Sequence, residues 1–117
     1  MPGVNKVTSF AILLGSIIVA SCGAPPRAAV PALTPENAMA LLRYNPKAQT
    51  WITYVKKQNP TCDYKLELPD QMAQPTSIDL DHIVVCGGRP SPKEFDASVS
   101  FEFDRSKQKW VIRRFAS

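Results

Sequence analysis

A run of residues without charge near the start of the chain limits the part of it that can fold. Residues 7–21 carry no charged side chain, Lys6 precedes them, and a proline- and alanine-rich stretch follows. A membrane-spanning helix needs about 20 apolar residues, so the run is short for a span but well sized for a secretory leader. A buried helix that is apolar all round would need a larger core than this chain can build. The sequence therefore predicts one domain, over residues 34–117.

The end of this run consists of an aliphatic residue, two small residues and a cysteine: Val19, Ala20, Ser21 and Cys22. This pattern resembles the lipobox of bacterial lipoprotein precursors. The resemblance implies that residues 1–21 are a cleaved signal peptide, that diacylglycerol is attached to the Cys22 sulfur, and that the new amino group is acylated. Two or three acyl chains hold a soluble domain at a bilayer, where one chain binds only reversibly. A plain cleaved signal peptide and an uncleaved anchor are the alternatives.

Residues 22–33 are expected to form a tether between the membrane and the domain. Their prolines fix φ and favour extended conformations, which makes such a segment semi-rigid. Gly23 stands where retention in the inner membrane of many Gram-negative bacteria would favour Asp. By the same resemblance we expect the cell envelope, at the periplasmic face of the outer membrane if the cell has one.

The two remaining cysteines, Cys62 and Cys86, are expected to form a disulfide because an exported domain meets oxidising conditions. Residues 62–68 and 78–86 each alternate apolar and polar side chains, as half-buried strands do. In an antiparallel hairpin, the register that places the cysteines opposite each other also pairs further apolar residues: Tyr64 with Val84 and Leu68 with Leu80. Closing this loop would stabilise the fold by about 3 to 4 kcal/mol. A reactive or metal-binding thiol pair is the alternative, but the C-x-x-C spacing is missing.

Signals for the start of a helix occur at Thr34 and at Asn45, each of which can cap a helix and is followed by a proline. Asn59 and Pro60 end the second helix. The inward-facing residues expected are Ala38, Leu41 and Leu42 in the first helix and Ala48, Trp51, Ile52 and Val55 in the second.

Near the end of the chain, residues 98–103 alternate again and residues 109–115 return along them. The predicted register pairs Phe103 with Trp110 and Phe101 with Ile112. The sequence therefore predicts an α+β domain: two N-terminal helices against one face of a four-stranded antiparallel β-meander, with one disulfide.

Polar candidates for chemistry are few. Asp79, Asp81 and His82 are close in sequence, but on a strand the two acids face one way and the imidazole the other. We therefore expect no catalytic site, and a partly buried structural histidine at position 82. No metal ligand set and no cofactor are expected. A small hydrolase that uses His82 with Asp79 or Asp81 is kept as a third functional hypothesis.

The sequence has 14 basic and 10 acidic residues, a mild excess that is interspersed until the last dozen residues, so nucleic-acid binding is not expected. Five basic residues then surround Trp110: Arg105, Lys107, Lys109, Arg113 and Arg114. A solvated strand end, contact with anionic lipid headgroups and contact with an acidic partner all fit this pattern.

Long, rigidly mounted loops often carry recognition, and residues 87–96 form such a connection after Cys86. The candidate partner-binding residues are Arg89, Pro90, Pro92, Lys93 and Phe95. The leading hypothesis is a non-enzymatic, lipid-anchored binding or accessory module of the bacterial cell envelope, which touches the membrane through its anchor and an envelope protein through this loop. The alternative is an inhibitor or immunity protein that blocks a secreted cell-wall enzyme. No feature indicates an oligomeric state.

Overall fold

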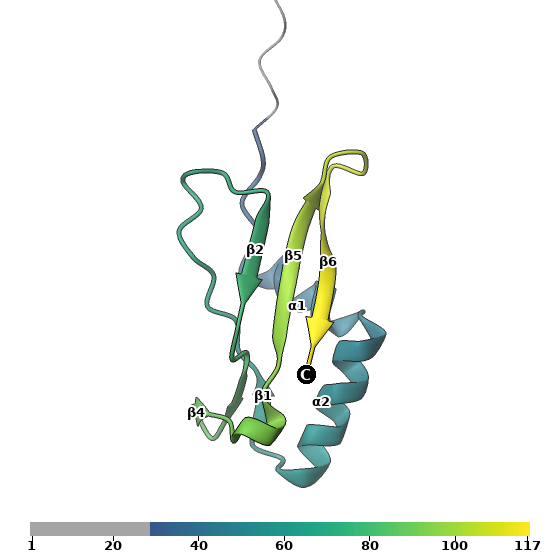
Figure 1. The fold of residues 1–117 in the computed structure, drawn as a ribbon, viewed down its shortest axis with the longest axis vertical. Helices are drawn as coiled ribbons and strands as arrows, with labels where there is room; N and C mark the ends of the chain where they lie inside the picture. The colour runs from purple at the N-terminus through teal and green to yellow at the C-terminus, as the bar shows by residue number, and fades with distance from the viewer. Residues whose placement is uncertain (1–28) are drawn as a thin grey trace, which may run out of the picture.

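The computed structural model describes residues 29–117 and shows an α+β domain, as predicted (Figure 1). The expected cleavage and lipidation site lies outside the described residues. Along the chain the elements are α1 (Pro35–Arg43), α2 (Pro46–Gln58), β1 (Cys62–Tyr64), β2 (Ser77–Leu80), β3 (Val84–Cys86), β4 (Arg89–Pro90), a 3₁₀ helix η3 (Lys93–Phe95), β5 (Ser98–Asp104) and β6 (Lys109–Ala116). No helix in residues 29–117 is long and apolar enough to cross a membrane.

Both helices begin where the capping signals predict. The Thr34 hydroxyl accepts a hydrogen bond from the Asn37 N–H at 3.1 Å, and the Asn45 side-chain oxygen accepts one from the Ala48 N–H at 3.0 Å. Each cap satisfies an amide that has no partner inside its helix. The faces that turn inward bury Ala38 and Leu42 in α1 and Ala48, Ile52 and Val55 in α2. Leu41 and Trp51 are only half-buried.

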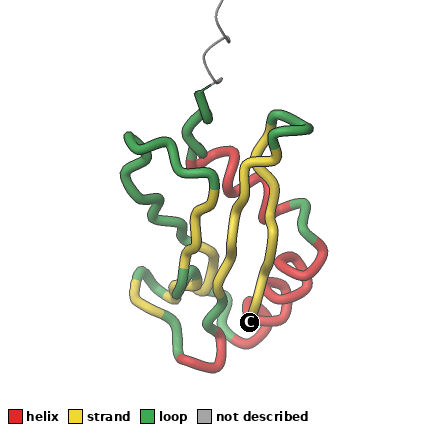
Figure 2. The backbone as a smooth tube through the Cα atoms, turned by 45° about the horizontal axis from the view of Figure 1, so that its top comes forward, coloured by secondary structure: helices red, strands yellow, loops and turns green. Residues whose placement is uncertain are grey.

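The strands form two antiparallel sheets of three strands each, in the orders β1–β3–β4 and β2–β5–β6. The prediction of a single four-stranded meander is therefore wrong. The error lies in β2, which pairs with β5 and places Leu80 opposite Val99 instead of Leu68. Figure 2 shows the three long strands side by side, with the helices beside and behind them.

The expected strand over residues 78–86 is divided in two by His82. This residue has a φ of 56°, in the left-handed region that strands do not use, so the chain turns from one sheet into the other. The His82 side chain is 81% exposed, which contradicts the prediction of a partly buried histidine. Ile83 is buried instead and joins the sheets, because its N–H donates to the Ala97 carbonyl at 3.1 Å and its carbonyl accepts from the Lys65 N–H at 2.7 Å.

The disulfide between Cys62 and Cys86 is present, and the predicted register around it is confirmed. Cys62 lies opposite Cys86, and Tyr64 lies opposite Val84. The β5–β6 hairpin is also confirmed: Phe103 pairs with Trp110 and Phe101 with Ile112.

The core lies between the helices and the inner faces of both sheets. Its largest contributions come from β5 and β6, which bury Phe101, Phe103, Trp110 and Phe115. Tyr64 links the small sheet to α2, since its hydroxyl donates to the Ala48 carbonyl at 2.6 Å. Burial, and then the neighbouring charge of Asp63, raise the pKa of this phenol above its ordinary value.

The domain begins before the first helix. Val30 is 7% exposed and Leu33 is 1% exposed, so the last residues of the expected tether belong to the core. The Gln71 side chain holds Leu33 at both backbone groups, accepting from its N–H at 2.7 Å and donating to its carbonyl at 2.9 Å. The Trp110 indole N–H donates to the Pro31 carbonyl at 2.9 Å. The start of the described chain is therefore fixed against the upper end of the sheet in Figure 1.

Candidate functional site

The candidate partner-binding surface is built on the disulfide-linked sheet. Residues 87–96, here called segment 87–96, leave β3 directly after Cys86 through two glycines with φ of 61° and 78°. Such a turn needs two left-handed residues, which glycine adopts without a steric penalty. The segment returns as β4, where Arg89 lies opposite Cys86 and Pro90 opposite Val85. Its first half is therefore mounted on a covalently linked strand pair.

Three further hydrogen bonds fix the second half of segment 87–96. The Ser91 N–H donates to the Val84 carbonyl at 3.2 Å, the Phe95 N–H donates to the Pro92 carbonyl at 2.9 Å, and the Trp51 indole N–H donates to the Phe95 carbonyl at 3.2 Å. The backbone is thus tied to β3, to itself and to α2. A segment held in this way loses little conformational entropy when it binds a partner.

Four of the five predicted contact residues are exposed: Arg89, Pro90, Pro92 and Lys93. Phe95 is half-buried and packs against the core, so it supports the segment from beneath. The exposed surface therefore combines two cations with two rigid proline rings.

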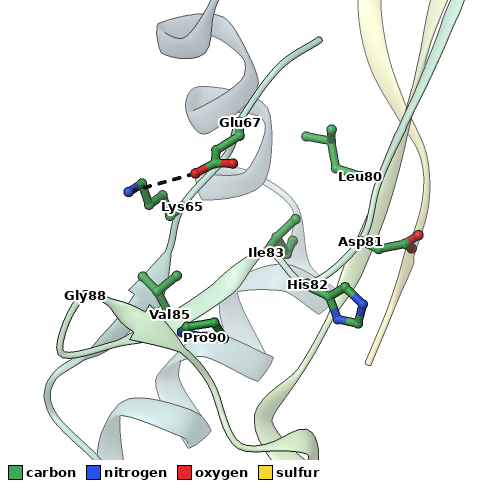
Figure 3. Close-up of a pocket in the computed structure, with 9 residues that line it drawn as sticks. All are labelled: Lys65, Glu67, Leu80, Asp81, His82, Ile83, Val85, Gly88 and Pro90. Carbon is green, nitrogen blue, oxygen red and sulfur yellow. Dashed lines mark ion pairs between the residues drawn. The ribbon is translucent and has the colours of Figure 1, made fainter.

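Two hollows flank β4 and share Pro90 and His82. The first has a volume of about 320 Å³ and lies between the two sheets (Figure 3). Lys65 and Glu67 line one wall as an ion pair at 4.0 Å, while Val85 and Pro90 line another. The second hollow, of about 520 Å³, is lined by His82, Val84, Pro90, Ser91, Lys93 and Asp96. Pro90 thus borders both depressions, as His82 does.

The polar chemistry at this surface centres on His82 and Asp96. The imidazole Nδ1 lies 2.6 Å from the Asp96 Oδ2, and Asp79 is engaged elsewhere, with Arg113 at 3.6 Å. This corrects the partners expected for a hydrolase, since the carboxylate at the imidazole is that of Asp96 and not that of Asp79 or Asp81. Ser91 lines the same hollow, but within residues 29–117 no hydrogen bond joins its hydroxyl to the imidazole. The pair can orient a hydrogen bond to a bound group, and in the described part of the chain no hydroxyl or thiol forms a hydrogen bond with it.

Sequence reasoning missed Asp96, and the reason is geometric. The backbone bond from Ile83 to Ala97 brings position 96 beside position 82, and this contact depends on the unpredicted corner at His82. In the sequence Asp96 simply follows Phe95 in a loop, and nothing in this local pattern predicts a contact with His82. Within the part of the chain that the structure describes, no group of three or more His, Cys, Asp or Glu side chains could hold a metal ion.

Comparison with protein-family models, with curated proteins and with solved structures gives no match for this chain.

Proposed function

We propose that the protein is a lipid-anchored binding or accessory module of the bacterial cell envelope, held at the membrane through Cys22 and bound to an envelope protein through segment 87–96. The likeness of residues 19–22 to a lipobox supports the anchor. The disulfide supports an oxidising compartment, where such bonds form and persist.

The observation that carries the proposal is the placement of segment 87–96 relative to the start of the domain. Residues 30–33 are fixed at one end of the molecule through Gln71 and Trp110, whereas β4 and η3 lie at the opposite end (Figure 1). A chain anchored at Cys22 would therefore present Arg89, Pro90 and Lys93 away from the membrane. This is the orientation that a membrane-held binding module requires.

The partner contact is tested by photo-crosslinking in the envelope of the producing cell. A photoreactive amino acid replaces Pro92, and the matched control carries it at Tyr44, which is 83% exposed on the α1–α2 turn. We expect one reproducible protein adduct when the photoreactive residue is at position 92. The same adduct should not form when that residue is at position 44. The adduct should fall at least fivefold in an Arg89→Ala, Lys93→Ala double variant and persist in Lys57→Ala. The same diffuse adducts from positions 92 and 44 would refute the contact.

The anchor is tested separately by mass spectrometry of the mature protein. We expect a chain that begins at Cys22 and carries diacylglycerol and an amide-linked acyl group, and a Cys22→Ser variant that stays unprocessed. A mature chain without lipid would contradict the anchor and leave the crosslinking result intact. If the adduct is a cell-wall hydrolase whose activity falls on binding, the inhibitor hypothesis replaces the accessory one.

A further inference from the structure

Strand β6 has a free edge. It is eight residues long, and among residues 29–117 it pairs with β5 alone. Within residues 29–117, its backbone makes no hydrogen bond to any segment other than β5. Alternate residues of an edge strand point their N–H and C=O groups outward, where another extended chain can pair with them. The described part of the molecule therefore ends in an open hydrogen-bonding row.

A hollow adjoins the C-terminal half of this edge. Figures 1 and 2 both show α2 beside the end of β6. Between them lies a space of about 320 Å³, mostly apolar and lined by Pro46, Lys47, Thr50, Trp51, Phe115 and Ser117. A chain paired with β6 would run along this hollow and could place one apolar side chain in it. Backbone pairing with a pocket for a side chain is the basis of recognition by strand addition.

The charged side chains of β6 are all basic. β6 contains Lys109, Arg113 and Arg114 and no acidic residue, and Lys47 lies at the hollow. Asp79 offsets part of the Arg113 charge at 3.6 Å, but Arg114 and Lys109 form no ion pair within residues 29–117. An acidic segment is complementary to this row. A second copy of the chain is not, because two antiparallel β6 strands would bring their cations together.

We propose that the outer edge of β6 binds an extended acidic segment of a partner protein by strand addition, with an apolar side chain of that segment in the hollow between α2 and Phe115. The basic residues oppose indiscriminate pairing at this edge, and so does the register shift opposite Ser100 and Phe101, where Arg113 is an extra residue in β6. Negative charge on the incoming strand removes the electrostatic part of that barrier. This contact is independent of segment 87–96 and of Cys22.

The test uses the full chain in phosphatidylcholine nanodiscs and a fluorescent octapeptide of sequence Phe-Asp-Val-Asp-Val-Asp-Val-Asp. We expect saturable binding and slower amide exchange over residues 109–116. The control peptide has the same sequence with every peptide nitrogen methylated, which keeps its charge and removes its backbone donors. It should bind at least tenfold more weakly, since the lost hydrogen bonds carry the contact. Lys109→Glu and Arg114→Glu should each weaken the octapeptide about tenfold, while the matched Lys93→Glu leaves it unchanged.

Four results would overturn the proposal, and three of them need only the unaltered protein. Equal binding of the N-methylated peptide would show attraction by charge alone. Slower exchange in β6 on phosphatidylglycerol nanodiscs, with none on adding the peptide, would assign the edge to lipid headgroups. A doubled protein mass with protected β6 amides would assign it to a second copy. An equal loss of binding in Lys93→Glu would place the peptide elsewhere.

Discussion

The two sheets of this domain are stabilised in different ways. The β2–β5–β6 sheet has strands of four, seven and eight residues and buries Phe101, Phe103, Trp110 and Phe115. The β1–β3–β4 sheet has strands of three, three and two residues and holds the disulfide. Short strands offer few hydrogen bonds, so a covalent link adds to the packing of Cys62, Tyr64 and Val84 in the sheet that carries segment 87–96. The difference shows how a small domain can hold a rigid, exposed segment on its shorter strands.

The largest expected effect breaks the packed sheet. Phe101 is fully buried, and Phe101→Ala should lower the free energy of unfolding by about 3 to 5 kcal/mol, because it removes apolar contact and leaves a cavity. Urea denaturation followed by tryptophan fluorescence measures the change. The neighbouring exposed residue gives the control, Glu102→Ala, which should stay within about 0.5 kcal/mol of the parent. A loss below about 1 kcal/mol in Phe101→Ala would mean that the aromatic core is not the main support.

Removing the disulfide tests the other half of the comparison. The cysteines are 24 positions apart, so the Cys62→Ala, Cys86→Ala variant should lose about 3.5 kcal/mol in the chain-entropy estimate. Hydrogen exchange should accelerate first in β1, β3 and β4, while amides between β5 and β6 stay protected longer. Equal acceleration in both sheets would show that the domain has one cooperative unit and that the contrast between the sheets has no energetic meaning.

Tyr64→Phe sharpens the comparison by cutting the bond between the small sheet and α2. Loss of the hydrogen bond to the Ala48 carbonyl should cost about 1 kcal/mol at neutral pH. The pKa of Tyr64 is higher in the folded state than in the unfolded state, where it is about 10. The contribution of the neutral phenol to the free energy of unfolding is therefore fully present below about pH 10 and is lost as the pH rises above that value.

Denaturation of the parent and of Tyr64→Phe between pH 7 and 11 should therefore give stability curves that converge above about pH 10. Tyr44→Phe is the control, because that phenol is 83% exposed. Curves that remain parallel over the whole range would contradict the role of the buried phenol.

The smallest expected effect concerns the corner between the sheets. A β-branched residue in the left-handed conformation is strained, so His82→Val should be less stable than His82→Asn by about 1 kcal/mol. Both variants lose the imidazole, which makes asparagine the matched control for the bond to Asp96. Equal thermal stability of the two would indicate that β2 and β3 can join into one strand, and the division into two sheets would then be weak.

Local features of the sequence predicted local structure well. The caps at Thr34 and Asn45 and the β5–β6 register follow from neighbouring residues, and all are confirmed. The register at Cys62 and Cys86 was predictable because a disulfide and alternating side chains restrict it together. The strand that pairs with β2 was not predictable. Leu68 and Val99 are equally suitable apolar neighbours for Leu80, and the alternation of apolar and polar residues does not distinguish between them.

The candidate surface was predicted in part for similar reasons. Prolines and cations after two glycines indicate an exposed connection, and Arg89, Pro90, Pro92 and Lys93 are exposed. The depth of Phe95 and the contact between His82 and Asp96 depend on tertiary packing. The burial of Val30 and Leu33 was not predicted, because two apolar residues among prolines and alanines show no periodicity.

The hydrogen bonds that hold residues 30–33 against the domain have a mechanical consequence. A pull on the chain ahead of Ala29 would load the hydrogen bonds from Trp110 to Pro31 and between Gln71 and Leu33 before it reached α1. These bonds join the leading residues to β6 and to the loop before β2, so the load would enter the larger sheet directly. The first helix, and the small sheet with its exposed segment, would then keep their shape while the domain is under tension.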